Sequence, residues 1–141
     1  MIWRRAVIVA PILQYRFAAA TQTSSETSPK GGGWMAVKEI DGKDFVRMII
    51  DSRRPFLVDF WAPWCMPCKM TGPVLDQFSD KHGSKVDVFK LNVEQNQELA
   101  DELGIKGIPT LLAIHDRKVI KNIVGYHPLP ELEKELDRLL H

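Results

Sequence analysis

The only two cysteines of the chain, Cys65 and Cys68, are separated by two residues. At this spacing they can close one small disulfide ring, and a pair that opens and closes reversibly carries two electrons. They follow an apolar run, Phe56 to Trp61, and precede a stretch with helical periodicity, Met70 to Lys81. The sequence therefore predicts a redox-active dithiol at the junction of a strand and a helix.

This position predicts different roles for the two thiols. The first turn of a helix has unpaired backbone N–H groups and a partial positive charge, which stabilise a thiolate. We therefore expect Cys65 to be the nucleophile, with a pKa below the ordinary thiol value of about 8.5. Cys68 lies one turn further into the helix, where we expect it to be more buried and to resolve the mixed disulfide.

Other uses of a cysteine pair fit this chain less well. A structural zinc site needs about four ligands, but there is no third cysteine and the histidines show no paired spacing. Covalent haem attachment needs a histidine directly after the second cysteine, where this chain has Lys69. A disulfide that closes so short a loop constrains the unfolded chain little, so a purely structural role is also disfavoured.

Length and charge indicate one ordinary domain with an N-terminal extension. The chain has 141 residues, of which 45% are hydrophobic, and a net charge of +1. The extension, residues 1–33, holds four of the basic side chains and one of the acidic ones, which leaves residues 34–141 with 15 basic and 17 acidic side chains. This mildly acidic balance argues against a nucleic-acid-binding face.

Residues 1–33 have the composition of a removable targeting segment and a flexible linker. Arginines occur throughout, the first acidic residue is Glu26, and a Ser/Thr-rich run precedes three glycines, as in mitochondrial transit peptides. A secretory signal would explain Arg4, Arg5 and the apolar run after them, but not Arg16 beside the small-residue cleavage site. We expect the protein to be located in the mitochondrial matrix, with secretion as the alternative. The apolar run is too short to span a bilayer.

Periodicity and breakers predict alternating strands and helices in the remaining chain, which is the α/β class. The expected elements are an edge strand over 35–40, a helix capped by Asp41 or Asp44, a buried strand over 56–61, a helix to Lys81 that Pro73 kinks or interrupts, a strand over 86–93, a short helix over 99–103 capped by Asn96, strands over 111–114 and 119–126, and a closing helix over 132–140.

Asp59 is the polar exception in the apolar strand before the cysteines. Strand alternation places it on the same face as Leu57 and Trp61, so we expect it to be buried. Burial would raise its pKa and make it a proton acceptor near the dithiol. Lys90, in the next strand, either faces solvent or reaches Asp59.

Residues 35–140 resemble the thioredoxin family along nearly their whole length. Several separate motifs carry the resemblance: Val58-Asp59-Phe60-Trp61-Ala62-Pro63-Trp64-Cys65-Met66-Pro67-Cys68-Lys69, then Pro73, Lys90-Leu91-Asn92-Val93, Gly107-Ile108-Pro109-Thr110 and Val124-Gly125. The resemblance implies a thioredoxin fold over residues 34–141, with a central mixed five-stranded sheet flanked by four helices.

The resemblance also implies a set of site residues. Cys65 would attack substrate disulfides and Cys68 would release the product, with Asp59 and Lys90 as the buried proton-handling pair. Pro109 would be cis and face the cysteines, and the Ile108 backbone would pair with the substrate chain. The substrate groove would be lined by Trp64, Met66, Pro67, Ile108, Pro109 and Gly125.

The predicted function is that of a protein disulfide reductase that binds no cofactor or metal and receives electrons from NADPH through thioredoxin reductase. Expected partners are that reductase and disulfide-containing proteins such as peroxiredoxins, with no nucleic acid and no membrane, and the expected state is a monomer.

Met66 departs from the glycine that is usual after the first cysteine. This departure and the targeting segment leave open a secreted thiol oxidase or isomerase, and a non-catalytic subunit that docks partners in the groove is the third alternative.

Overall fold

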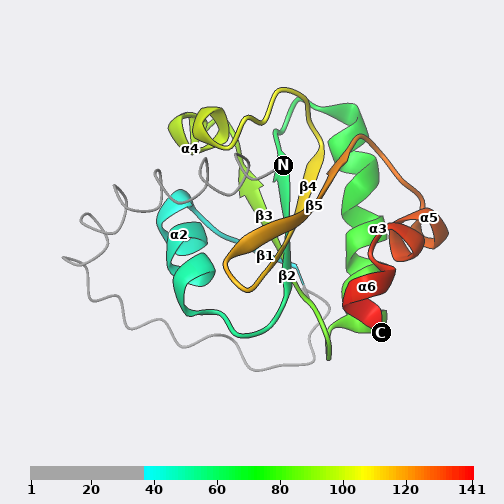
Figure 1. The fold of residues 1–141 in the computed structure, drawn as a ribbon. Helices are drawn as coiled ribbons and strands as arrows, with labels where there is room; N and C mark the ends of the chain where they lie inside the picture. The colour runs from blue at the N-terminus through cyan, green and yellow to red at the C-terminus, as the bar shows by residue number, and fades with distance from the viewer. Residues whose placement is uncertain (1–36) are drawn as a thin grey trace.

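The computed structural model describes residues 37–141 (Figure 1). The predicted targeting segment, its boundary at residue 33 and the first two residues of the predicted edge strand lie outside these residues.

Helices and strands follow the predicted order, except that two short helices stand where one closing helix was expected. Their bounds are β1 (Lys38–Glu39), α2 (Gly42–Asp51), β2 (Phe56–Trp61), α3 (Met66–His82), β3 (Asp87–Asn92), α4 (Gln97–Glu102), β4 (Thr110–His115), β5 (Lys118–Val124), α5 (Leu129–Glu135) and α6 (Asp137–Leu140).

The five strands form one mixed sheet in the order β1-β3-β2-β4-β5. Strand β3 runs parallel to β1 and β2, whereas β4 runs antiparallel to β2 and β5. Strand β2 is central and its first five residues are buried, as expected for an apolar strand with helices on both faces. The predicted fold class is confirmed.

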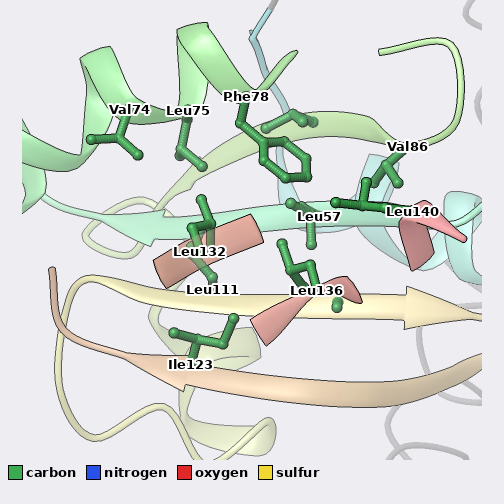
Figure 2. Close-up of a cluster of buried hydrophobic side chains, with 12 residues drawn as sticks. Leu57, Val74, Leu75, Phe78, Val86, Leu111, Ile123, Leu132, Leu136 and Leu140 are labelled. Atoms are coloured by element: carbon green, nitrogen blue, oxygen red, sulfur yellow. The ribbon is translucent and has the colours of Figure 1, made fainter. Parts of the chain in front are cut away.

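Helices cover both faces of the sheet, with α2 and α4 on one side and α3, α5 and α6 on the other (Figure 1). Figure 2 shows the second of these layers, where α3 and the C-terminal segments meet the sheet. Its labelled side chains are Leu57, Val74, Leu75, Phe78, Val86, Leu111, Ile123, Leu132, Leu136 and Leu140. This packing fixes α3, and with it the two cysteines, against the end of β2.

Three local expectations are corrected or sharpened. Helix α3 runs through Pro73 without interruption, because the proline removes only the bond to the carbonyl of Lys69 and both residues are exposed. The closing helix is two short helices, since Leu136 leaves the helical conformation with φ −105° and ψ 13°. Asn96 precedes α4 but makes no side-chain cap there; its amide instead donates to the Asn92 carbonyl.

The start of α2 follows the sequence closely. The Asp41 carboxylate accepts the Asp44 backbone N–H at 2.8 Å, and the Asp41 N–H donates to the Asp44 carboxylate at 3.4 Å. The sequence offered Asp41 or Asp44 as the cap, and the structure has Asp41 as the N-cap with Asp44 completing a reciprocal capping box. Across residues 37–141, none of the helices has the length and apolar character that crossing a membrane requires.

Candidate redox active site

Cys65 occupies the N-cap position of α3, directly before the helix begins at Met66. Its Sγ accepts the backbone N–H of Cys68 at 3.2 Å, so it takes one of the N–H groups that the helix leaves unpaired. The same N–H and the helix dipole stabilise negative charge on this sulfur when the pair is reduced. This geometry supports Cys65 as the nucleophile.

Cys65 and Cys68 are joined by a disulfide, so the structure shows the oxidised pair. The expectation that Cys68 is the more buried of the two holds only by a small margin, because the exposed fractions are 5% for Cys65 and 4% for Cys68. Both pack in a small cluster with Ala62, against Trp61 and Ile108. The two cysteines therefore differ in their place on the helix more than in burial.

The loop before β4 lies against the disulfide. The peptide bond between Ile108 and Pro109 is cis, as the resemblance implied, and the Ile108 carbonyl oxygen lies 3.8 Å from Cys65 Sγ. The Gly125 N–H donates to the Pro109 carbonyl at 2.8 Å, which joins this loop to the end of β5. Gly125 has φ +90°, a conformation that side-chain-bearing residues rarely adopt.

Trp64 projects into solvent beside the cysteines, with 67% of the residue exposed. Its indole N–H donates to the Glu94 carboxylate at 2.6 Å, and the Glu94 backbone N–H donates to Asn92 Oδ1 at 2.9 Å. A charged acceptor strengthens the indole bond and holds the ring in one place. Sequence reasoning missed Glu94; the only local signal is an acidic residue just after the Lys90-Leu91-Asn92-Val93 motif.

The other predicted groove residues lie on the segments next to the cysteines and on the loop before β4. Met66 and Pro67 are the first two residues of α3 and are exposed, whereas Pro109 is buried and Ile108 is half-buried. The structure thus brings together all six residues of the predicted groove, on three segments that are distant in sequence. Their contacts with substrate stay a prediction.

Asp59 is buried in the middle of β2, with 3% of the residue exposed, as expected. Burial raises the pKa of its carboxyl from 3.8 to about 7, and the positive charge of Lys90 opposes this rise. Lys90 lies directly across from Asp59 in the register of β2 and β3. A carboxyl with a pKa near neutrality can exchange a proton under the conditions in which thiols react.

One oxygen of this carboxyl and one nearby ring nitrogen are buried and have no hydrogen-bond partner within residues 37–141. They are Asp59 Oδ1 and Trp61 Nε1, on side chains two residues apart in β2 and therefore on one face of the sheet. Lys90 Nζ lies 5.2 Å from the centre of the Trp61 ring, within cation–π range. The described structure thus places one acid, one amine and one indole on the sheet face that α3 covers.

No three His, Cys, Asp or Glu side chains in the described part of the chain gather in a way that could hold a metal ion. The chemistry that the arrangement supports is exchange between thiols and disulfides at Cys65 and Cys68, with Asp59 available as a proton acceptor.

Comparison with known proteins also points to thiol-disulfide chemistry, because the proteins that match this chain are thioredoxins. A family model described as Thioredoxin matches residues 36–138. A thioredoxin of Alicyclobacillus acidocaldarius is 45% identical over 91 residues, which cover 64% of this chain and 87% of the relative. A thioredoxin of Chlorobaculum thiosulfatiphilum is 43% identical over 99 residues, which cover 70% of this chain and 92% of the relative.

The fold comparison agrees with the sequence comparison. The crystal structure of chloroplastic thioredoxin z superimposes with a TM-score of 0.67 at 27% identity, covering 74% of this chain and 95% of that one. The match in family, fold and cysteine geometry leads to one conclusion: the chain belongs to the thioredoxin family, and its Cys65–Cys68 pair makes it a thiol-disulfide oxidoreductase.

Proposed function

We propose that this oxidoreductase works as a protein disulfide reductase. The observation that carries the proposal is the position of Cys65 Sγ at the helix N-terminus, where it accepts the Cys68 N–H at 3.2 Å. A sulfur held in this way is stabilised as a thiolate, which is the form that attacks disulfides. The half-buried Ile108 and the exposed Trp64 supply apolar surface beside it for a protein substrate.

The Cys65–Cys68 dithiol supplies both electrons that the substrate disulfide needs. The Cys65 thiolate attacks one sulfur of the substrate disulfide and forms a mixed disulfide, while the other substrate sulfur leaves as a thiolate and takes a proton. Cys68 then loses its proton to the Asp59 carboxylate and attacks Cys65 Sγ, which releases the second substrate thiolate. Two electrons pass to the substrate, and the Cys65–Cys68 disulfide remains.

An external donor must reduce this disulfide again, and we propose NADPH acting through a flavoprotein thioredoxin reductase. Peroxiredoxins and other disulfide-containing proteins are the proposed substrates, and the proposed state is a monomer. The test is insulin reduction by the full chain with NADPH and thioredoxin reductase, compared with Cys65→Ser and Cys68→Ser. Turnover should be lost in both variants; turnover that survives Cys65→Ser would refute the proposal.

The oxidase or isomerase alternative rests on Met66, which stands where the family usually has glycine. The reduction potential of the Cys65–Cys68 couple separates the two functions. A potential near the thioredoxin value of about −270 mV supports the reductase, whereas about −120 to −180 mV would indicate an oxidant or isomerase.

We also propose that the protein works in the mitochondrial matrix, on the composition of residues 1–33. Import of the full chain into isolated mitochondria, with cleavage of the N-terminal segment, tests this location. Deletion of residues 1–33 should abolish import. Entry of the full chain into the secretory pathway instead would favour the alternative.

A further inference from the structure

Exposed large apolar side chains gather at one end of the described domain. Trp64, Met66 and Met70 lie at the start of α3, while Val124 and Tyr126 flank Gly125 at the end of β5. The contact between the Gly125 N–H and the Pro109 carbonyl places the end of β5 against the cis-proline loop, whose Ile108 lies beside Cys65. Concentrated exposed apolar surface marks a site of interaction.

Met66 and Met70 extend this surface along α3. They are four residues apart on the helix and so lie on one face, with exposed fractions of 65% and 54%. Lys69 and Pro73 are exposed and share that face by the same spacing. We call Met66, Lys69, Met70 and Pro73 the methionine strip; Lys69 is the only charged residue in the first two turns of α3.

We propose that the methionine strip determines substrate specificity by binding a large apolar side chain that lies next to the disulfide of a substrate protein. This inference rests on the proposed reductase function. Because Met66 follows Cys65 directly, the strip begins next to the sulfur that receives the substrate. Covering the strip with an apolar side chain removes both methionines from water, whereas a polar side chain gains nothing comparable.

The residue types indicate how selective the strip is. Methionine is flexible and polarizable, so it adapts to apolar side chains of different shapes. The Lys69 ammonium makes a basic side chain at the same place unfavourable, since like charges repel. The strip should therefore prefer Leu, Phe or Met near the substrate cysteine, accept polar residues poorly, and disfavour Arg and Lys.

The test compares three disulfide-linked peptides that differ at one position, two residues from the cysteine, which is Leu, Gln or Arg. The value of kcat/KM is measured with the reduced full chain and divided by the rate with 2-hydroxyethyl disulfide, which corrects for thiol reactivity. We expect a preference for Leu over Gln of about tenfold, equivalent to ~1.4 kcal/mol, with Arg below Gln.

Met66→Gln combined with Met70→Gln keeps side-chain length and removes the apolar surface, so the preference should fall below about threefold. The matched control is Ile120→Gln, which changes an exposed apolar residue toward the other end of β5 and should keep the preference. A preference that is absent from the unaltered chain, or that survives the double substitution, overturns the inference.

Two further outcomes are informative. If the unaltered chain reduces all three peptides equally, the inference fails while the reductase function stands; if it reduces none of them and no insulin, both fail. Sedimentation of the full chain tests another occupant of the strip. Dimerisation that the double substitution abolishes would show that the strip binds a second copy of the chain, and would also overturn the inference.

Discussion

Replacing Asp59 by asparagine should stabilise the folded protein, and the gain should grow with pH. The buried carboxyl has a pKa of about 7 in the folded state, against 3.8 for the unperturbed group. Its contribution to stability is therefore fully present below about pH 4 and is lost as pH rises through about 7, because the folded state must release a proton that it holds more tightly. Asparagine keeps the shape without this penalty.

The size of the effect follows from the shift. Each unit of pKa corresponds to about 1.4 kcal/mol, so the carboxylate costs on the order of 4 kcal/mol once it is fully ionised. Between pH 5 and pH 8 the stability difference between Asp59→Asn and the unaltered protein should grow by about 2–3 kcal/mol, and it should level off above pH 7. Lys90 already limits the penalty, since its positive charge lowers the Asp59 pKa.

Urea unfolding of the oxidised proteins at several pH values from 5 to 8 measures this difference. Asp80→Asn, at an exposed position of α3, is the matched control and should show no comparable growth with pH. A constant difference for Asp59→Asn, or one that grows as pH falls, would refute the burial argument. The same variant should also resolve mixed disulfides more slowly, because Cys68 loses its proton acceptor.

Four other predictions test the site. In a Lys90→Gln background, the stability gain from Asp59→Asn should level off at a higher pH, because the charge that lowers the Asp59 pKa is removed. A gain that levels off at the same pH would show that Lys90 does not affect the Asp59 pKa. Iodoacetamide at neutral pH should label Cys65 before Cys68 in the reduced protein, and mass mapping that finds the opposite order would reverse their roles. Cys68→Ser should trap substrates as mixed disulfides through Cys65, and an oxidised lysate that yields no such adduct would count against the mechanism. Met66→Gly should lower the free energy of unfolding by at most about 1 kcal/mol and shift the reduction potential by less than about 30 mV; a much larger shift in redox titration would mean that Met66 sets the potential.

Patterns that involve neighbouring residues were predictable. The apolar run that became β2, the Asp41 capping box and the place of Cys65 before a helix depend on contacts within a few residues, so periodicity and residue type reveal them. The burial of Asp59 was predictable for the same reason, because its neighbours in the strand are large and apolar. The resemblance to a family supplied the remaining site residues.

Other predictions failed or were missing because they depend on contacts between distant segments. Asn96 was expected to cap α4, but its carboxamide oxygen accepts the Gly42 N–H from another helix at 2.8 Å. The two cysteines are nearly equally buried because both belong to one small cluster with Ala62, against which Ile108 packs, and no local pattern indicates this cluster. Glu94 holds the Trp64 indole from 30 positions away.

Most of the elements, the dithiol and its place at the start of a helix could be predicted from the sequence, since each depends on residues within a short stretch of the chain. The groups around the dithiol depended on tertiary structure: the register places Lys90 opposite Asp59, and the loop before β4 places the Ile108 carbonyl 3.8 Å from Cys65 Sγ. The physical reason is that these relations arise from packing of the sheet and helices. Packing brings together residues whose spacing along the chain carries no information about their distance in space.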